Sequence, residues 1–309
     1  MKRNFRLSNS FCSLNPFVYH TLLCLCALSA SASAAGAANV RSQPGLEMIK
    51  NMGGEFNQGY TLNPIEFLNI GQKWTGGNEG LANLKDIAQL HHLHLYCTEL
   101  NEEGLKYLAG LPDLQALSID KMKINASGWK HISAIHSLQA LILGGESIGA
   151  IQLLSMDKLQ SLSIRGLTKL QTIEICCQPQ LHTLEIEWTP QLQKLDIRQL
   201  PQLKSLSIHN DISVIQSVID IRLGTLPKLE DLSLSVSAIS GLQLPDTLKS
   251  LTLWNTLVPE STLKDFGLLK NLENLRLCSS QITDGHFALF KNCRKMRTLE
   301  LSCNKFQNS

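Results

Sequence analysis

The sequence lacks an excess of charge of either sign, and it has no linker-like stretch within residues 65–309. It contains 28 Lys and Arg and 26 Asp and Glu. Three of the basic residues lie in residues 1–37, which contain no acidic residue, so the rest of the chain has 25 basic and 26 acidic residues. A nearly neutral protein has no basic field to attract polyanions, so we expect no nucleic-acid partner. Without a Pro-, Gly- or Ser-rich linker, a single domain is favoured over two.

The motifs of several enzyme and metal-site classes are also absent. The sequence contains no H-E-x-x-H, no phosphate-binding glycine loop and no C-x-x-C pair. These absences argue against a zinc protease, a P-loop nucleotide site and a structural zinc site, and we expect no cofactor, no bound metal and no enzymatic activity.

Cysteine usage leaves two interpretations open, because a disulfide between Cys278 and Cys303 and burial as small apolar side chains both fit. The six cysteines after residue 37 are Cys97, Cys176, Cys177, Cys278, Cys293 and Cys303.

Long hydrophobic runs are missing except near the start of the chain. Residues 1–6 hold three basic side chains, 17–28 are mainly apolar, and small residues follow, with Ala-Ser-Ala at 32–34. This pattern predicts a cleaved signal peptide over residues 1–37, because the apolar run is short for a transmembrane helix. The alternative is an uncleaved anchor. We therefore expect a secreted or periplasmic protein with no membrane span after cleavage.

What the sequence does contain is an eleven-residue repeat in its centre. The segments LQSLSI, LQTIEI, LHTLEI, LQKLDI and LKSLSI begin at Leu159, Leu170, Leu181, Leu192 and Leu203. Apolar and polar residues alternate within each segment, so each one predicts a short strand with one apolar face. Eleven residues cannot bury such a face alone, whereas stacked copies bury one another's faces, and this predicts a solenoid.

The same L-x-x-L-x-L phrase extends over most of the chain at intervals of 19 to 26 residues, provided that Leu170 and Leu192 belong to the opposite side of the coil. Its copies begin at Ile65, Leu90, Leu114, Leu138, Leu159, Leu181, Leu203, Leu229, Leu248, Leu272 and Met296. After several strands comes a polar stretch ending in Gly and an apolar residue, such as TELNEEGL at 98–105 and QITDGHF at 281–287.

These phrases make the chain resemble bacterial leucine-rich repeat proteins with ribonuclease-inhibitor-like repeats and a nested eleven-residue block in the centre. The resemblance implies an α/β leucine-rich repeat solenoid of about eleven rungs over residues 65–309. Its parallel β-sheet would form the concave face, and helices, short strands and turns the convex face. Residues 38–64 are expected to be an N-terminal cap containing a helix and a hairpin. Asn101, Ser127 and Asp284 suit the first turns of convex helices.

Two short patterns resemble catalytic or metal-binding motifs. Gly145–Gly149 has the form G-x-S-x-G, but it follows a repeat strand, so we interpret its glycines as turn residues and keep a Ser147 hydrolase as the minority hypothesis. His92 and His94 share one face of a strand without an evident third ligand. A polar binding surface is therefore the preferred interpretation of the two histidines.

Function is expected to reside in the outward-facing side chains of the main strands. Ser and Thr dominate the central rows, and at roughly 4.8 Å per strand the array would be long enough for a protein or peptide ligand. Aromatic and arginine side chains are the usual interface hot spots, so the expected binding residues are Tyr96, Arg165, Trp188, Trp254 and Arg276. The alternatives are an envelope structural protein, a glycan-binding protein or a secreted effector acting on a host protein. A homodimer through the C-terminal edge is a further hypothesis, because no cap follows the last repeat in the sequence.

Overall fold

The computed structural model describes residues 44–57, 67–87, 89–97, 99–145, 148–153, 156–210, 218–240, 242–302 and 304. All of its elements belong to the unit Ser42–Ser309. The signal peptide expected at residues 1–37 lies outside the described residues, as do parts of the expected cap.

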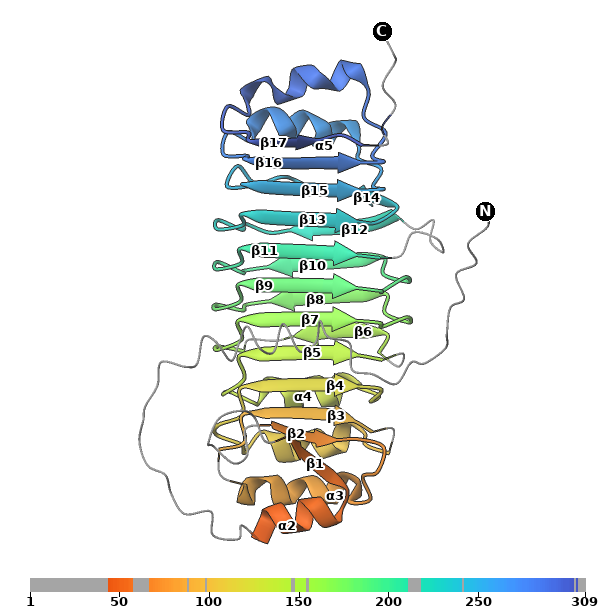
Figure 1. Ribbon diagram of the computed structural model, residues 1–309, viewed down its shortest axis with the longest axis vertical. Coiled ribbons are helices and arrows are strands. Elements are labelled where there is room, and N and C mark those ends of the chain that lie inside the picture. The colour runs from red at the N-terminus through yellow and green to blue at the C-terminus, as the bar shows by residue number, and fades with distance from the viewer. Residues whose placement is uncertain are drawn as a thin grey trace, which may run out of the picture. The chain divides into compact units, whose positions relative to one another are not determined.

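Two β-sheets face each other across a shared core (Figure 1). We call them the long sheet, of twelve strands, and the return sheet, of five. The long sheet contains β1 (Gly54–Asn57), β2 (Phe67–Ile70), β3 (His92–Tyr96), β4 (Ala116–Asp120), β5 (Ala140–Gly144), β7 (Ser161–Arg165), β9 (Thr183–Glu187), β11 (Ser205–His209), β13 (Asp231–Ser235), β15 (Ser250–Trp254), β16 (Asn274–Cys278) and β17 (Thr298–Glu300). The return sheet contains β6 (Ala150–Leu153), β8 (Thr172–Cys176), β10 (Lys194–Arg198), β12 (Val218–Leu223) and β14 (Ala238–Ser240).

The repeat leucines form continuous columns inside the stack. Leu162, Leu184 and Leu206 are direct neighbours on β7, β9 and β11, and each is at most 1% exposed. The segments beginning at Leu170 and Leu192 form β8 and β10 on the opposite sheet, as their spacing predicts. Alternation places one side chain in the core and the next in solvent along each strand, so every coil contributes apolar residues to one core from both sheets.

Helices replace the return strands towards both ends of the stack, as the polar Gly-containing phrases predict. The helical segments are α2 (Pro44–Asn51), α3 (Gly77–Gly80), η1 (Leu81–Asp86), η2 (Glu102–Leu108), α4 (Ala126–Ser133), α5 (Glu260–Asp265), η3 (Phe266–Leu268) and η4 (Asp284–Asn292), where η denotes a 3-10 helix. The Asn101 side chain caps η2 by accepting from the Glu103 N–H at 3.0 Å. Asn125 caps α4 in the same way, accepting at 2.9 Å from the N–H of Ser127, which lies in the first turn as expected.

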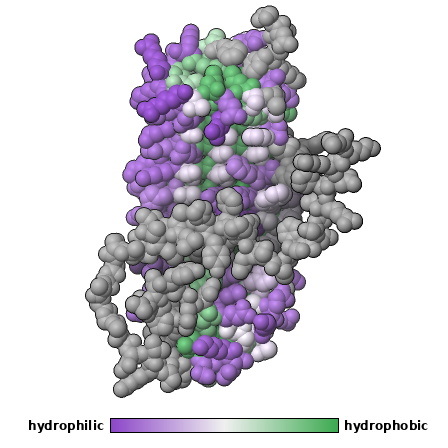
Figure 2. Space-filling model, in the orientation of Figure 1, coloured by the Kyte–Doolittle hydropathy of each residue, from purple (hydrophilic) through white to green (hydrophobic). Residues whose placement is uncertain are grey.

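The two edges of the long sheet differ. At one edge β1 runs antiparallel to β2, and Ile49 of α2 is fully buried beside it. At the other edge β17 is exposed along its length, and Leu299 and Leu268 are 45% and 60% exposed. Hydrophobic residues accordingly reach the surface at the C-terminal end of the stack (Figure 2). None of the described helices has the length and hydrophobicity that crossing a bilayer requires.

Candidate ligand-binding surface on the long sheet

The solvent face of the long sheet presents the polar members of each strand in aligned rows. On β9, β11 and β13, for example, Glu185, Ser207 and Ser233 are direct neighbours. Four outward positions differ from the sequence-based expectation because they are buried, at 2–6% exposed: Ala116, Ala140, Ser163 and Cys278. Cys278 accepts a hydrogen bond from Ser302 Oγ at 3.0 Å.

Trp188 stands out at the end of β9 because its large apolar side chain is exposed. The residue directly follows β9, has a φ of 56° and is 58% exposed. Its N–H donates to the carbonyl of His209 at 3.0 Å, which holds it in this turn. The same left-handed position follows other strands of the sheet, where it is occupied by Gly145 and Gly166 and also by Lys121, Asn255 and Ser279. A left-handed backbone is costly for a bulky side chain, and an exposed indole recovers little of that cost by packing.

Trp254 provides a second exposed indole on the same edge of the sheet. It is the last residue of β15 and is 52% exposed. Strands β11 and β13 lie between β9 and β15, so the two indoles are about three strand spacings, or about 14 Å, apart. We call the residues that connect them, together with the indoles, the Trp188–Trp254 surface: Trp188, His209, Ser233, Ser235 and Trp254.

The centre of the Trp188–Trp254 surface is polar and locally ordered. His209 Nε2 lies 2.8 Å from Ser233 Oγ and 3.4 Å from Ser207 Oγ. His209 is also the cross-strand neighbour of Ser235. The hydroxyl and imidazole groups can donate and accept hydrogen bonds, while the indoles offer apolar area at each end. This arrangement suits noncovalent docking of an extended ligand.

Tyr96 lies far along the sheet from this surface and makes local contacts of its own. Its hydroxyl accepts a hydrogen bond from Lys121 Nζ, which also lies 4.4 Å from the ring centroid. The His94 ring is 6.1 Å from the Tyr96 ring, centroid to centroid. Tyr96 is therefore part of an ordered group with Lys121 and His94, not an isolated exposed ring.

His94 gives a prediction for the pH dependence of stability. Burial lowers its pKa, and the nearby Asp120 carboxylate acts in the opposite direction more weakly. Because the folded protein holds the proton less tightly than the unfolded chain, this stabilisation is present above about pH 6.5 and is lost as the pH falls. We expect His94→Gln to reduce the fall in melting temperature between about pH 8 and about pH 5.5, measured by differential scanning fluorimetry. His136→Gln, which alters an exposed histidine, is the matched control and should keep the wild-type profile.

Arg165 and Arg276 are paired with carboxylates on neighbouring strands. The Arg165 Nη2 lies 2.9 Å from Glu185, and its Nε 3.5 Å from Glu187, with the arginine side chain 19% exposed. Arg276 Nε lies 3.2 Å from Glu300, and both side chains are more exposed. Arg165 offsets one of the two negative charges of Glu185 and Glu187, so one negative charge remains beside Trp188.

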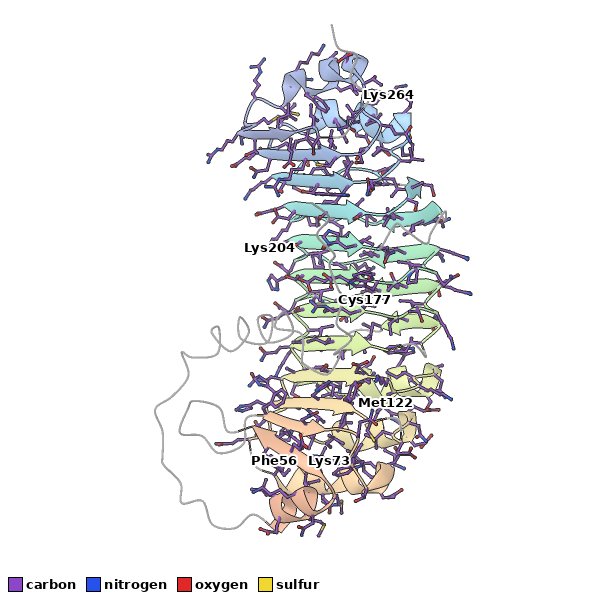
Figure 3. All side chains as sticks on the ribbon, turned by 45° about the vertical axis from the view of Figure 1, so that its right-hand side comes forward. Phe56, Lys73, Met122, Cys177, Lys204 and Lys264 are labelled. Atoms are coloured by element: carbon purple, nitrogen blue, oxygen red, sulfur yellow. The ribbon has the colours of Figure 1, made fainter. Side chains whose placement is uncertain are left out.

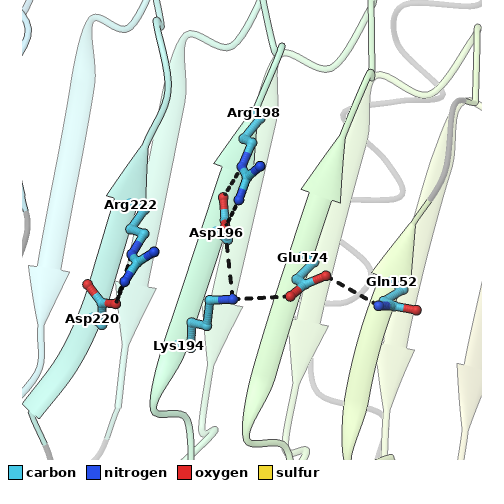
Figure 4. Close-up of polar contacts among 7 residues, drawn as sticks. All are labelled: Gln152, Glu174, Lys194, Asp196, Arg198, Asp220 and Arg222. Atoms are coloured by element: carbon cyan, nitrogen blue, oxygen red, sulfur yellow. Dashed lines mark hydrogen bonds and ion pairs between the residues drawn. The ribbon is translucent and has the colours of Figure 1, made fainter.

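The outer face of the return sheet is also internally paired (Figure 4). Five polar side chains are linked to one another, namely Gln152, Glu174, Lys194, Asp196 and Arg198, and Asp220 and Arg222 form a separate pair. Asp196 is the most buried, at 4% exposed, and the hydrogen bonds from Arg198 lower the pKa of its carboxyl. Glu174 accepts from both Lys194 and Gln152 at 3.2 Å, and its pKa is lowered as well. These groups satisfy one another, so this face is less suited to a ligand than the exposed indoles.

Stacked L-x-x-L-x-L strands with buried leucine columns, a parallel sheet on one side and helices with short strands on the other define the architecture. The chain folds as a leucine-rich repeat solenoid. No protein-family model matches the sequence, and no curated protein matches it significantly.

Several solved leucine-rich repeat structures are similar to this solenoid at low sequence identity. An internalin (inlF) from Listeria monocytogenes is 18% identical, with 92% of this chain and 93% of that chain covered and a TM-score of 0.27. The leucine-rich repeat domain of the type III effector XopL is 16% identical, with 95% and 98% covered and a TM-score of 0.34. The ectodomain of the plant receptor kinase GASSHO1 from Arabidopsis thaliana is 15% identical, with 73% and 31% covered and a TM-score of 0.28. Such low TM-scores add nothing to the assignment, which rests on the stacked strands.

The two motif-like patterns in the sequence have different outcomes. Glu146 and Ser147 lie outside the described residues, so the hydrolase hypothesis stays a prediction. His92 and His94 lie on β3, and within the described part of the chain no three His, Cys, Asp or Glu side chains gather as metal ligands would. His209 was not among the residues expected to bind. The spacing of the repeats could have placed His209 at a strand end near Trp188 and Trp254. Its hydrogen bond to Ser233 could not be predicted from the spacing.

Proposed function

We propose that this protein is a non-catalytic binding module that docks an extended peptide segment of a partner protein on the long sheet. The observation that carries the proposal is the exposure of two indoles, Trp188 and Trp254, at the ends of β9 and β15. An exposed indole gains little stability from packing within the fold, so a contact with a ligand explains it better. Exposed tryptophans are the side chains that most often contribute large binding energies.

The spacing of the indoles agrees with a peptide ligand. A separation of about 14 Å corresponds to about four residues of extended chain, so Trp188 and Trp254 would contact the ligand's side chains i and i+4. His209 and Ser235 between them would hydrogen-bond to its backbone. Arg165 offsets only one of the two negative charges of Glu185 and Glu187, so we expect the ligand to carry no acidic side chain beside Trp188.

A glycan is the second candidate ligand, favoured by the same juxtaposition of indoles with hydroxyl groups. Sugar rings stack on aromatic faces while their hydroxyls bond to polar neighbours, and Trp254 beside Ser235 could provide both. A neutral oligosaccharide that displaces the partner would favour this alternative. A synthetic peptide from the partner that displaces it would favour the peptide.

Proximity labelling with the exported protein should identify the partner, and capture by purified protein should test the surface. We expect wild-type protein to retain the partner and Trp188→Gly and Trp254→Ala to lose it. Leu268→Ala is the matched control, because Leu268 is 60% exposed on a helix of the other side and reports nonspecific hydrophobic adhesion. Equal capture by all four proteins would contradict the proposal. Export itself is a proposal that rests on residues 1–37 of the sequence alone.

We also propose that a second copy of the chain pairs with the edge of β17. Among the described residues β17 pairs only with β16, and Leu299 is 45% exposed. An unpaired strand edge with an exposed leucine can extend a sheet across a twofold axis. Sedimentation over a dilution series should show a dimer that dissociates, and Leu299→Lys should shift the mass to that of the monomer. A monomeric mass for the wild-type protein at all concentrations would remove the proposal.

A further inference from the structure

Two adjacent cysteines, Cys176 and Cys177, lie together at the solvent side of the return sheet. Cys176 is the last residue of β8, and Cys177 begins the following turn with a φ of 62°. Successive side chains of a strand point to opposite faces, but the left-handed turn interrupts that alternation. Both cysteines are therefore partly exposed. Figure 3 marks Cys177 near the middle of the strand stack.

Burial separates this pair from the other cysteines that the structure describes. Cys97, Cys278 and Cys293 are free and between 2% and 6% exposed, so they fit the interpretation of cysteine as a small core residue. Cys176 and Cys177 do not fit it. On the next coil, Arg198 and Gln199 occupy the equivalent positions, with Gln199 at a φ of 55°. The turn therefore requires no thiol, and packing does not account for two of them.

The two thiols lie close to each other and share one acceptor. The Cys177 thiol donates to Gln199 Oε1 at 2.7 Å, and the Cys176 sulfur lies 3.6 Å from the same oxygen. The hydrogen bond with the Cys177 thiol is the main reason why the pKa of Cys176 is raised, and desolvation adds to it. Cys176 therefore keeps its proton to higher pH than an isolated cysteine. Because both sulfurs contact the same oxygen, the pair has the form of a dithiol in which either sulfur can reach a mixed disulfide on the other.

We propose that Cys176 and Cys177 form a redox-active dithiol that low-molecular-weight disulfides, such as oxidised glutathione, convert to a disulfide between the two residues. The Cys177 thiolate attacks one sulfur of the oxidised glutathione, its S–S bond breaks, and a mixed disulfide and one glutathione thiolate result. Cys176 then gives up its proton and attacks the Cys177 sulfur. The mixed disulfide breaks, the second glutathione thiolate leaves, and the pair has lost two electrons and two protons.

Backbone geometry makes this bond suitable for exchange. Adjacent Cα atoms across a trans peptide are about 3.8 Å apart, whereas ordinary disulfides join Cα atoms about 4.4–6.8 Å apart. Closing the ring requires the intervening peptide to adjust, and bonds outside the usual geometry are more easily reduced. We therefore expect a disulfide that forms and reopens reversibly as the ratio of oxidised to reduced glutathione around the protein changes.

The test uses the full chain, reduced and then treated with oxidised glutathione. Trypsin should release residues 170–194, which contain Cys176 and Cys177 and no other cysteine. In the wild-type protein we expect this peptide to be lighter by two hydrogens and to regain that mass after reduction. In Cys176→Ser the reaction should stop at a glutathione adduct on Cys177, because no second thiol resolves it. Cys278→Ser, which alters a buried thiol elsewhere, should behave like the wild type.

Three outcomes would overturn the proposal. The first is a wild-type peptide that keeps two free thiols under conditions in which Cys176→Ser forms the adduct. The second is a stable glutathione adduct on the wild-type pair. The third is a disulfide that joins two copies of the chain. All three readouts are taken on the peptide, so they do not depend on the identity of any ligand of the long sheet.

Discussion

Replacing Leu184 with alanine is expected to lower the free energy of unfolding by about 3 kcal/mol, within a range of about 2–5 kcal/mol for buried leucines. Leu184 is fully buried in the column between Leu162 and Leu206. Removing its terminal carbons loses transfer free energy and leaves a cavity that neighbouring coils cannot fill without moving. Each coil of a solenoid contacts mainly its neighbours, so a cavity in the centre also weakens the coupling between the two halves.

Urea unfolding followed by circular dichroism measures this effect, and we expect a lower midpoint together with a broader transition. Thr183→Ala is the matched control, because Thr183 is the preceding residue of β9 and only partly buried. Its replacement should change the free energy of unfolding by less than about 0.5 kcal/mol. A loss below about 1 kcal/mol for Leu184→Ala would contradict the column of buried leucines as the main source of stability.

Trp188→Gly is expected to weaken binding of the peptide partner by about 30-fold, which corresponds to about 2 kcal/mol for one hot-spot side chain. The change removes the indole and keeps the backbone, because Gly145 and Gly166 already adopt the same left-handed turn in other repeats. Trp254→Ala should weaken binding to a similar extent from the other end of the surface. Isothermal titration with the partner, once identified, measures both effects.

The melting temperature of Trp188→Gly shows whether a loss of affinity comes from the missing indole or from damage to the fold. Glycine adopts a positive φ without steric cost, so we expect Trp188→Gly to hold or raise the melting temperature while affinity falls. Lys73→Ala is a useful second variant, since it removes an exposed ion pair with Glu55 at the far end of the long sheet and should leave affinity unchanged. Unchanged affinity in both tryptophan variants would show that the ligand does not bind at this surface.

Local sequence was sufficient for some elements of this fold and not for others. The helix beginning after Asn101 was predictable, because an asparagine side chain that caps the first turn is a local interaction. Ser127 lies in the first turn of α4, as expected, whereas its capping residue Asn125 was not singled out, since Asn and Ser can both accept from the first N–H groups and only geometry selects one. The outward position of Cys278 was predicted from alternation alone. Its burial depends on Ser302 of the next coil.

The sequence by itself determined the solenoid, because a leucine at every fixed interval can be buried in only one way, by stacking equivalent strands. It also determined which side of each coil carries the longer sheet, since the intervals remain regular only when Leu170 and Leu192 belong to the return side. The tertiary structure alone decided which polar residues are engaged with one another. Arg165 is held by two glutamates of the next strand, Trp188 is exposed in a strained turn, and Cys176 and Cys177 share an oxygen of Gln199. Such contacts depend on side-chain directions and distances between coils, which a one-dimensional pattern does not contain.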